Sequence, residues 1–266
     1  MFEEYLQCWN LAPDGAPLRT PNSDLLPVTR EGAPAMLKLA REAEEQRGNA
    51  LMAWWDGRGS APVLARKGQA LLMTRAQGAR SLTAMAMAGD DDAATRILCR
   101  VAARLHACPG KPPFELVPLA EWFAPLTAAG SQGNAIIDLA AAIALELLES
   151  EIEPAVLHGD VHHANVLDFG GAKWLAIDPK GLFGERTFDF VNMLRNPDPE
   201  LAGEQGRVER QASLIAIEAK LDHKRLLRWL LAFSGLSAIW LLGDGDEPAL
   251  DMRMAEIAAA QLQLSV

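Results

Sequence analysis

The sequence contains few cysteines and is short of positive charge, and each shortage excludes a class of protein. Its three cysteines, Cys8, Cys99 and Cys108, include no Cys-x-x-Cys pair, which argues against a disulfide scaffold and for a reducing compartment such as the cytoplasm. The net charge of -10 repels the phosphate backbone of nucleic acid, so we expect no nucleic-acid partner. The same charge favours a small cationic partner or a metal-bound nucleotide, although acidity alone can also keep a cytosolic protein soluble.

The chain also lacks a basic leader segment and a long apolar run. Its first ten residues, MFEEYLQCWN, carry two glutamates and no basic residue, which is atypical of a secretory signal. The apolar stretch at 229–243, WLLAFSGLSAIWLLG, is shorter than the roughly 20 residues that cross a bilayer, and Gly and Ser interrupt it. We therefore expect a buried helix at this position and no membrane partner.

Short apolar runs alternate with turn signals in the first 75 residues. Asp14-Gly15 and Glu31-Gly32 stand between strand-like runs and predict hairpin turns. In the segment 41–55 charged residues lead and apolar residues follow, which predicts one amphipathic helix packed on a small antiparallel sheet. The predicted order is β-β-β-α-β-β, and it describes an N-terminal lobe over 1–75.

Helical patterns dominate the remainder of the chain, 76–266. Asp90-Asp91-Asp92 can cap a helix in which apolar residues from Ile97 to Leu105 share one face. Further helices are predicted over 134–149, 208–220, 222–242 and 249–263. The Gly-containing stretch 73–79 marks the boundary between the lobes. The predicted fold class is α+β, with a small sheet lobe and a larger, mainly helical lobe in one domain.

A motif near the middle of the chain reads VLHGDVHHANVLDFGGAKWLAIDPKG, residues 156–181. Two strand-like runs flank Gly170-Gly171, which predicts a strand, a tight turn and a returning strand. This geometry brings Asn165, at the start of one strand, beside Asp178, at the end of its partner. It carries Asp168-Phe169-Gly170, which looks like the metal-binding tripeptide of protein kinases, toward the hairpin tip. We therefore predict that Asp178, and not Asp168, is the metal-binding carboxylate.

Asn165 and Asp178 present two oxygen donors, and a third carboxylate, Asp160, lies five residues before the asparagine. Such a set suits a hard cation with a nearby base. Magnesium together with a nucleotide phosphate fits it.

The histidines of the motif offer an alternative, because His158, His162 and His163 could ligate zinc. No His-Glu-x-x-His pattern accompanies them. We expect instead that His158 and His163 form hydrogen bonds that shape the loop.

The combination of His158-Gly159-Asp160, Asn165 and Ile177-Asp178-Pro179 resembles the signature of the aminoglycoside phosphotransferases and related small-molecule kinases. Within this family the chain is similar to the streptomycin 6-kinase group, the aminoglycoside/hydroxyurea resistance kinases. The likeness runs nearly end to end and includes PAMLK, WWDGRG, EWF, RLLRW and GDGD. It implies a two-lobed protein-kinase-like fold with ATP and magnesium as cofactors. It also implies that Asp160 is the base for a substrate hydroxyl and that Asn165 and Asp178 hold the magnesium.

The resemblance further implies a set of nucleotide contacts. Lys38 would bind the α- and β-phosphates, with Glu45 as its ion partner among the glutamates at 42, 44 and 45. The glycine-rich loop of protein kinases is missing, so Ser23 and main-chain N–H groups in TPNSDLLPV would take its place. Met73 and Arg75 would border the nucleotide at the junction of the lobes.

Acidic residues supply the candidates for binding a cationic substrate. Asp189 resembles the family's buried aspartate that braces the catalytic loop, and a helix cap is the open alternative. A polycationic aminocyclitol would be drawn to a cleft lined by carboxylates, for which the candidates are Asp160, Asp189, Asp198, Glu200, Asp244 and Asp246. Trp240 could stack on a guanidinium group, but its apolar surroundings favour a place in the core.

Three functions stay open on the sequence alone. The first is a kinase that phosphorylates a streptomycin-like aminoglycoside and so confers antibiotic resistance. The second is a kinase of the same fold that acts on another hydroxylated metabolite, such as an amino alcohol or a sugar. The third, a non-catalytic kinase-like binding protein, is disfavoured because the chain keeps Lys38, Asp160, Asn165 and Asp178.

Overall fold

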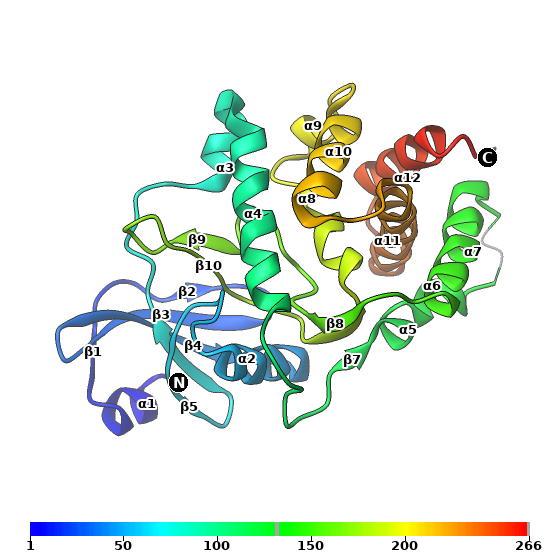
Figure 1. Ribbon diagram of the computed structural model, residues 1–266. Coiled ribbons are helices and arrows are strands. Elements are labelled where there is room, and N and C mark those ends of the chain that lie inside the picture. The colour runs from blue at the N-terminus through cyan, green and yellow to red at the C-terminus, as the bar shows by residue number, and fades with distance from the viewer. Residues whose placement is uncertain (131–132, 265–266) are drawn as a thin grey trace.

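The N-terminal part of the protein is an antiparallel sheet (Figure 1). The computed structural model describes residues 1–130 and 133–264. The strands are β1 (Leu11–Pro13), β2 (Leu18–Arg19), β3 (Ser23–Arg30), β4 (Ala33–Ala40), β5 (Val63–Lys67) and β6 (Ala70–Thr74). They lie in the order β1-β3-β4-β6-β5, and β2 also pairs with β3. A helix that the sequence pattern did not predict, α1 (Glu3–Cys8), precedes them and buries Tyr5 in the core of the sheet.

The two predicted hairpin turns differ in outcome. Glu31 and Gly32 join β3 to β4 with φ angles of 52° and 80°, which are typical of a two-residue hairpin, so this turn is confirmed. The prediction of a hairpin turn at Asp14-Gly15 is wrong, because β1 and β2 both pair antiparallel with β3 and therefore run in the same direction. Asp14 donates its N–H to the Pro27 oxygen at 2.8 Å, so the chain continues along β3 instead of reversing.

Helix α2 (Ala43–Trp55) follows β4, as the amphipathic segment 41–55 predicts. It buries Leu51 and Trp55 toward the C-terminal part and Met52 toward the sheet. One glycine is required by this packing, because a Cβ on Gly48 would lie 2.2 Å from the main-chain oxygen of Pro179. Helix α2 therefore touches the segment that directly follows Asp178.

Helices dominate the C-terminal part, and its long helices begin and end close to the predicted positions. They are α4 (Asp91–His106), α7 (Ala135–Glu149), α10 (Arg207–Ala219), α11 (His223–Asp244) and α12 (Ala249–Gln261). The shorter elements are α3 (Leu82–Met85), the π-helical turn η1 (Ala86–Asp90), α5 (Leu119–Trp122), α6 (Ala124–Thr127), the 3-10 helix η2 (Arg186–Phe190), α8 (Val191–Leu194) and α9 (Pro199–Ala202). Two small sheets complete this part: β7 (Val117–Pro118) with β11 (Leu182–Glu185) and β8 (Pro154–Leu157), and β9 (Val166–Asp168) with β10 (Trp174–Ala176). The predicted α+β fold class is confirmed.

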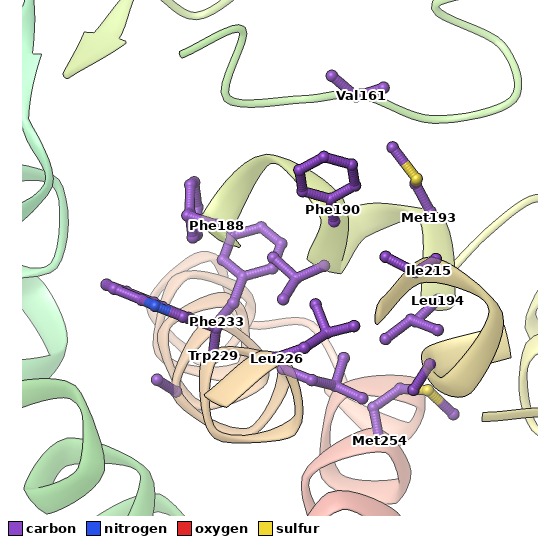
Figure 2. Close-up of a cluster of buried hydrophobic side chains, with 14 of the residues drawn as sticks. Val161, Phe188, Phe190, Met193, Leu194, Ile215, Leu226, Trp229, Phe233 and Met254 are labelled. Atoms are coloured by element: carbon purple, nitrogen blue, oxygen red, sulfur yellow. The ribbon is translucent and has the colours of Figure 1, made fainter. Parts of the chain in front are cut away.

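The core of the C-terminal part is centred on α11 (Figure 2). Phe188 packs edge to face on Trp229 and Phe233 at ring-centroid distances of 5.6 and 5.2 Å. The expectation that this segment is too short to cross a membrane is wrong, because the helix has 22 residues and is long and apolar enough to do so. The expected buried helix is confirmed, since 61% of its most apolar window is buried inside the protein.

Candidate active site

A two-stranded hairpin places the central residues of the motif. Strand β9 pairs antiparallel with β10, with Asp168 opposite Trp174 and Val166 opposite Ala176. One step further, Ile177 donates its N–H to the Asn165 oxygen at 2.9 Å. Asn165 and Asp178 therefore lie at one end of the hairpin and Asp168 at the other, which confirms the predicted placement.

Asp168 is part of a structural contact at the far end of this hairpin. Its carboxylate accepts two hydrogen bonds from Arg80, at 2.7 and 3.2 Å, and one from the Gly170 N–H at 2.9 Å. Its main-chain oxygen accepts the Gly78 N–H at 2.8 Å, and Arg80 also lies over the Trp174 ring. Asp168 thus ties the segment that leaves the N-terminal sheet to the hairpin. The hydrogen bond from Arg80 is the main cause that lowers the pKa of Asp168 to about 2.

This contact predicts a pH-dependent stability. The folded pKa of about 2 lies below the ordinary value of 3.8, so the pair stabilises the fold above about pH 4 and loses this effect as the pH falls toward 2. Asp168→Asn should therefore lower the Tm by a constant amount from pH 7 to about pH 5, and by progressively less below about pH 4. Thermal unfolding of both proteins across this range measures the difference. A difference that stayed constant down to pH 2.5 would contradict the assignment.

Two amide side chains hold the carboxylate of Asp160. Asn165 Nδ2 donates to Asp160 Oδ2 at 3.0 Å, and Asn192 Nδ2, on α8, donates to Asp160 Oδ1. Each carboxylate oxygen keeps a further lone pair for a substrate hydroxyl. Asn192 was not among the residues predicted from the sequence. Its position three residues after Asp189 places both residues on one side of a helical turn but does not indicate a contact with Asp160.

His158 connects the segment of Asp160 to that of Asp178. It is buried, its Nε2 donates to the Ile177 oxygen at 2.9 Å, and its Nδ1 accepts the Asp160 N–H at 3.2 Å. Burial lowers the pKa of His158, which favours the neutral ring that these two bonds require. The prediction that His158 shapes the loop by hydrogen bonding is confirmed.

Asp189 braces the same loop from η2. Its carboxylate accepts the N–H groups of His158 and Gly159 at 3.0 and 2.6 Å and is bound to His106 Nε2 at 2.7 Å. Burial acts to raise the pKa of Asp189, but the bonds from His106 and Gly159 outweigh it and hold the pKa below its ordinary value. The proposed contact of Asp189 with substrate is wrong, because the residue is 1% exposed and its oxygens are occupied. His106 is a second residue that the sequence analysis missed.

His163 differs from its expected role. It is 2% exposed, and in the described part of the chain neither of its ring nitrogens has a hydrogen-bond partner. Burial is the main cause that lowers its pKa to about 4, so the ring is neutral at pH 7. The prediction that His163 shapes the loop through hydrogen bonds is therefore wrong.

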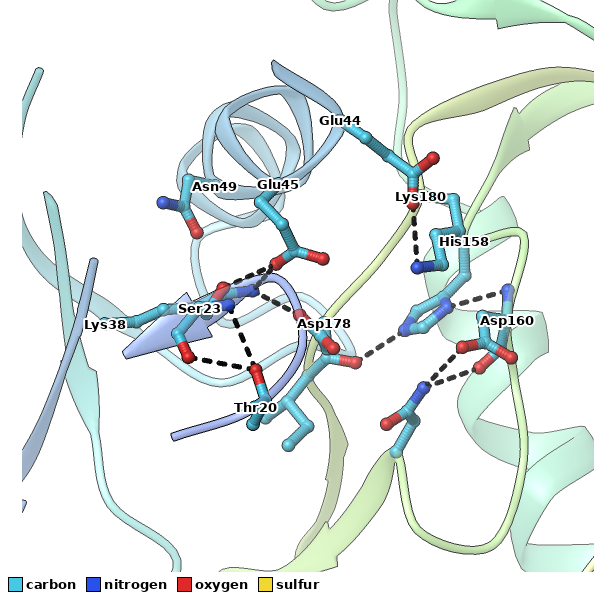
Figure 3. Close-up of polar contacts among 12 residues, drawn as sticks. Thr20, Ser23, Lys38, Glu44, Glu45, Asn49, His158, Asp160, Asp178 and Lys180 are labelled. Carbon is cyan, nitrogen blue, oxygen red and sulfur yellow. Dashed lines mark hydrogen bonds and ion pairs between the residues drawn. The ribbon is translucent and has the colours of Figure 1, made fainter. Parts of the chain in front are cut away.

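A buried lysine links the sheet to the hairpin (Figure 3). Lys38, on β4, forms ion pairs with both Glu45 of α2 and Asp178. Ser23 donates its hydroxyl to Glu45 Oε2 at 3.0 Å, and its N–H binds Thr20 Oγ1 at 3.0 Å. Burial acts to raise the pKa of Asp178, but the charge of Lys38 outweighs it, so the pKa lies below its ordinary value. The predicted pairing of Lys38 with Glu45 is confirmed.

An inner cavity of about 220 Å³ lies between the sheet and the hairpin. It is lined by Thr20, Ser23, Leu25, Lys38, Asn49, Met52, Leu71, Met73, Asn165, Ile177 and Asp178. An adjoining apolar cavity of about 250 Å³ shares Leu25, Met73 and Ile177 with it. Arg75 lines this second cavity but not the inner one, and its guanidinium group is bound to Asp14. Thr20 and Asn49 are wall residues that the sequence analysis missed.

A larger, open cavity of about 710 Å³ lies beside α2 and the end of α11. It is lined by Asn22, Glu44, Arg47, Val117, Glu121, Trp122, Pro125, Lys180, Trp240 and Asp244. Trp122 and Trp240 meet edge to face, with ring centroids 5.3 Å apart. Trp240 is half-buried: it packs against the hydrophobic core and also forms part of the cavity wall, so the prediction that it lies in the core is confirmed in part.

Only one of the remaining candidate carboxylates for substrate binding lines this open cavity. Asp244 does so, at the end of α11. Asp198 instead caps the start of α9 by accepting the N–H groups of Glu200 and Leu201. Glu200 and Asp246 are exposed and line none of the cavities described above. The structure offers Glu121 in their place.

The donor set at the hairpin end suits magnesium. The Asn165 amide nitrogen is bound to Asp160, which leaves its Oδ1 free to face a cation beside the Asp178 carboxylate. Two protein oxygen donors are typical of magnesium sites in which phosphate oxygens and waters complete the coordination. In residues 1–130 and 133–264 no three His, Cys, Asp or Glu side chains are grouped as a zinc site with three protein ligands requires, so the zinc alternative finds no support.

Comparison with known proteins places the chain in a family. A family model described as aminoglycoside/hydroxyurea antibiotic resistance kinase matches residues 8–245. The chain is 48% identical over 245 residues to a streptomycin 3''-kinase of Klebsiella pneumoniae, covering 90% of this chain and 92% of the relative. It is 34% identical to a hydroxyurea phosphotransferase of Kitasatospora aureofaciens, covering 98% and 77% of the two chains. A streptomycin 6-kinase of Streptomyces glaucescens is 30% identical, covering 98% and 88%.

Solved structures share the fold. A thermostable mutant of aminoglycoside phosphotransferase APH(4)-Ia, in a ternary complex with ADP and hygromycin B, matches with a TM-score of 0.68 at 15% identity, covering 97% of both chains. Choline kinase LicA from Streptococcus pneumoniae matches with a TM-score of 0.64 at 11% identity, covering 98% and 97%. At such identities the likeness shows the protein-kinase-like fold alone. Together with the family match, it shows that the chain belongs to the aminoglycoside/hydroxyurea antibiotic resistance kinases and is a phosphotransferase.

Proposed function

We propose that this protein transfers the γ-phosphoryl group of ATP to a hydroxyl of a streptomycin-like aminoglycoside in the cytoplasm. The observation that carries the proposal is the position of Asp160, which two amides hold beside Asn165, a wall residue of the inner cavity. The inner and apolar cavities would take the nucleotide, and the open cavity would take the acceptor.

The residues of the motif and the polar residues of the inner cavity have separate parts in this reaction. Asp160 accepts the proton of the acceptor hydroxyl. Lys38, kept in place by Glu45, binds the α- and β-phosphates after it leaves Asp178. Asn165 and Asp178 would hold magnesium, which offsets the negative charge of the phosphate oxygens. His158 and Asp189 keep the loop of Asp160 at a fixed distance from the end of β10.

The open cavity suits an acceptor that carries guanidinium groups. Glu121 and Asp244 offer carboxylates for forked pairing, and Trp122 and Trp240 offer ring faces and edges for stacking. The 48% identity to a streptomycin 3''-kinase, against 30% to a streptomycin 6-kinase, favours the 3''-hydroxyl of streptomycin over the 6-hydroxyl that the sequence resemblance implied.

The acceptor assignment predicts a salt effect. If Glu121 and Asp244 pair with guanidinium groups, each ion pair should contribute about 0.5 kcal/mol to streptomycin binding at low salt. High salt screens both pairs and should therefore raise the KM for streptomycin roughly fivefold. The test is purified protein with ATP and magnesium at 0.05 and 0.5 M salt, with the phosphorylated position identified by mass spectrometry and NMR. In the double variant Glu121→Gln, Asp244→Asn the salt effect should disappear.

Two results would overturn the acceptor assignment. One is a protein that binds ATP but yields no phosphorylated streptomycin at any salt concentration. The other is faster turnover of an amino alcohol or a sugar in the same assay, which would favour the metabolite-kinase alternative.

A further inference from the structure

We propose that Lys180 contacts the phosphoryl group while it passes from the nucleotide to the acceptor, which makes Lys180 a further catalytic residue. The inference rests on the proposed function. Lys180 lies two residues after Asp178, but the two side chains line different cavities: Asp178 the inner one and Lys180 the open one. The segment 178–180 therefore borders both cavities.

The main chain of Lys180 is fixed on both sides. Its N–H donates to the His158 oxygen at 2.7 Å, and its oxygen accepts from Arg47 Nε at 3.2 Å. The side chain is less firmly held: Lys180 Nζ lies 2.8 Å from Glu44 Oε1, and the side chain is 22% exposed (Figure 3). A fixed main chain with one exchangeable ion partner suits a lysine that exchanges a carboxylate for a phosphate oxygen.

The loop between β2 and β3 forms the opposite border of the two cavities. Thr20 and Ser23 line the inner cavity, whereas Asn22 lines the open cavity. The Ser23 N–H and hydroxyl are already bound to Thr20 and Glu45, so this loop has few donors left for a γ-phosphate. On the other border Lys180 offers a positive charge for the transferred group, in addition to the magnesium that Asn165 and Asp178 would hold.

Two cations, Lys180 and Arg47, line the cavity proposed for a cationic acceptor. The Arg47 guanidinium is bound to the Lys180 main-chain oxygen, so it is the Lys180 ammonium that requires an explanation. It would repel guanidinium groups, and the carboxylates that suit such groups come from other elements, Glu121 from α5 and Asp244 from α11. The anion that enters this cavity during the reaction is the phosphoryl group. Lys180 would thus attract the phosphoryl group and keep the guanidinium groups of the acceptor away from it.

In the transfer, the acceptor oxygen forms a bond to the γ-phosphorus. The bond from that phosphorus to the oxygen bridging the β-phosphate breaks, and its electron pair leaves on ADP. The hydroxyl proton goes to Asp160. The Lys180 ammonium leaves Glu44 and donates a charge-assisted hydrogen bond to a γ-oxygen as its charge is redistributed.

The first test is kinetic. Lys180→Met should lower kcat by about 10²-fold, the effect of losing one donor to a developing charge, while the KM for streptomycin changes less than about threefold. Lys180→Arg should restore part of the loss. Glu44→Gln removes the same ion pair but leaves the ammonium. Because Glu44 also lines the open cavity, this variant should raise the KM for streptomycin, but its kcat should fall by much less than in Lys180→Met. Equal losses in Glu44→Gln and Lys180→Met would overturn the proposal in favour of a structural ion pair.

The second test does not depend on the acceptor. Both proteins are titrated with AMP-PNP and with ADP in the presence of magnesium, and the ratio of the two dissociation constants, Kd for ADP over Kd for AMP-PNP, is compared. This ratio should be about tenfold larger for the wild-type protein than for Lys180→Met. Titration calorimetry with the two nucleotides measures this ratio. An unchanged ratio would overturn the role of Lys180. If the ratio changes but the protein phosphorylates no aminoglycoside, the proposed role of Lys180 is supported and only the proposed acceptor is rejected.

Discussion

Replacing Asp178 by alanine is expected to abolish magnesium-dependent turnover, with a loss of about 10³-fold or more. In the proposed site Asp178 and Asn165 would be the two oxygen donors to magnesium, at the end of the β9–β10 hairpin. Loss of the charged donor should cost several kcal/mol of transition-state stabilisation, at about 1.36 kcal/mol for each tenfold change in rate. The fold should survive, because Lys38 keeps its pairing with Glu45 when Asp178 is absent. Steady-state kinetics with ATP, with circular dichroism as a check on folding, measures the effect.

Asp168→Ala is the matched control, because it removes a carboxylate from the other end of the same hairpin. It breaks the contact with Arg80, so the Tm should fall, but kcat measured below that temperature should stay within about threefold of the wild-type value. Nucleotide binding separates the two further. Magnesium should strengthen AMP-PNP binding in the wild-type and Asp168→Ala proteins and should have little effect in Asp178→Ala. Equal losses of turnover in both folded variants would reject the choice of Asp178.

The hairpin was predictable because a short-range pattern determines it, whereas the pairing of Lys38 with Glu45 was implied by the family resemblance. Two glycines between strand-like runs define the turn, and the antiparallel register then places Asn165 beside Asp178 without any knowledge of the rest of the fold. The long helices were predictable for the same reason, since their apolar periodicity lies within each segment. The failed hairpin at Asp14-Gly15 shows the limit, because the direction of the chain there depends on pairing with residues up to Arg30.

The contacts that hold the site in place depend on segments far apart in the sequence. Asn192 reaches Asp160 across 32 positions, and His106 reaches Asp189 across 83. Neither residue type nor local spacing identifies such partners. The candidate carboxylates for binding the acceptor were predicted only in part, for a similar reason. An acidic residue on a helix surface does not stand out until packing places it on a cavity wall, as it does for Glu121 and the predicted Asp244 but not for Asp198 or Glu200.

Asp160→Asn is expected to lower kcat by about 10² to 10⁴-fold, which corresponds to roughly 3 to 5 kcal/mol. The amide cannot accept the hydroxyl proton. The new amide also cannot satisfy both of its neighbours. Asn165 and Asn192 each donate a hydrogen bond to a different oxygen of Asp160, and the asparagine side chain has only one oxygen to accept them. Its own NH₂ group would face one of the two donors, so position as well as chemistry is lost.

Asn192→Ala separates these two effects, because it keeps the carboxylate and removes only one donor. Its kcat should fall by about tenfold, the effect of a single lost hydrogen bond to a charged group, and therefore by less than in Asp160→Asn. Calorimetry should show that both variants bind AMP-PNP as the wild-type protein does, since neither residue lines the inner cavity. Turnover of Asp160→Asn near the wild-type rate would show that another group takes the proton. A loss in Asn192→Ala as large as in Asp160→Asn would show that the position of Asp160, and not proton transfer, limits the reaction.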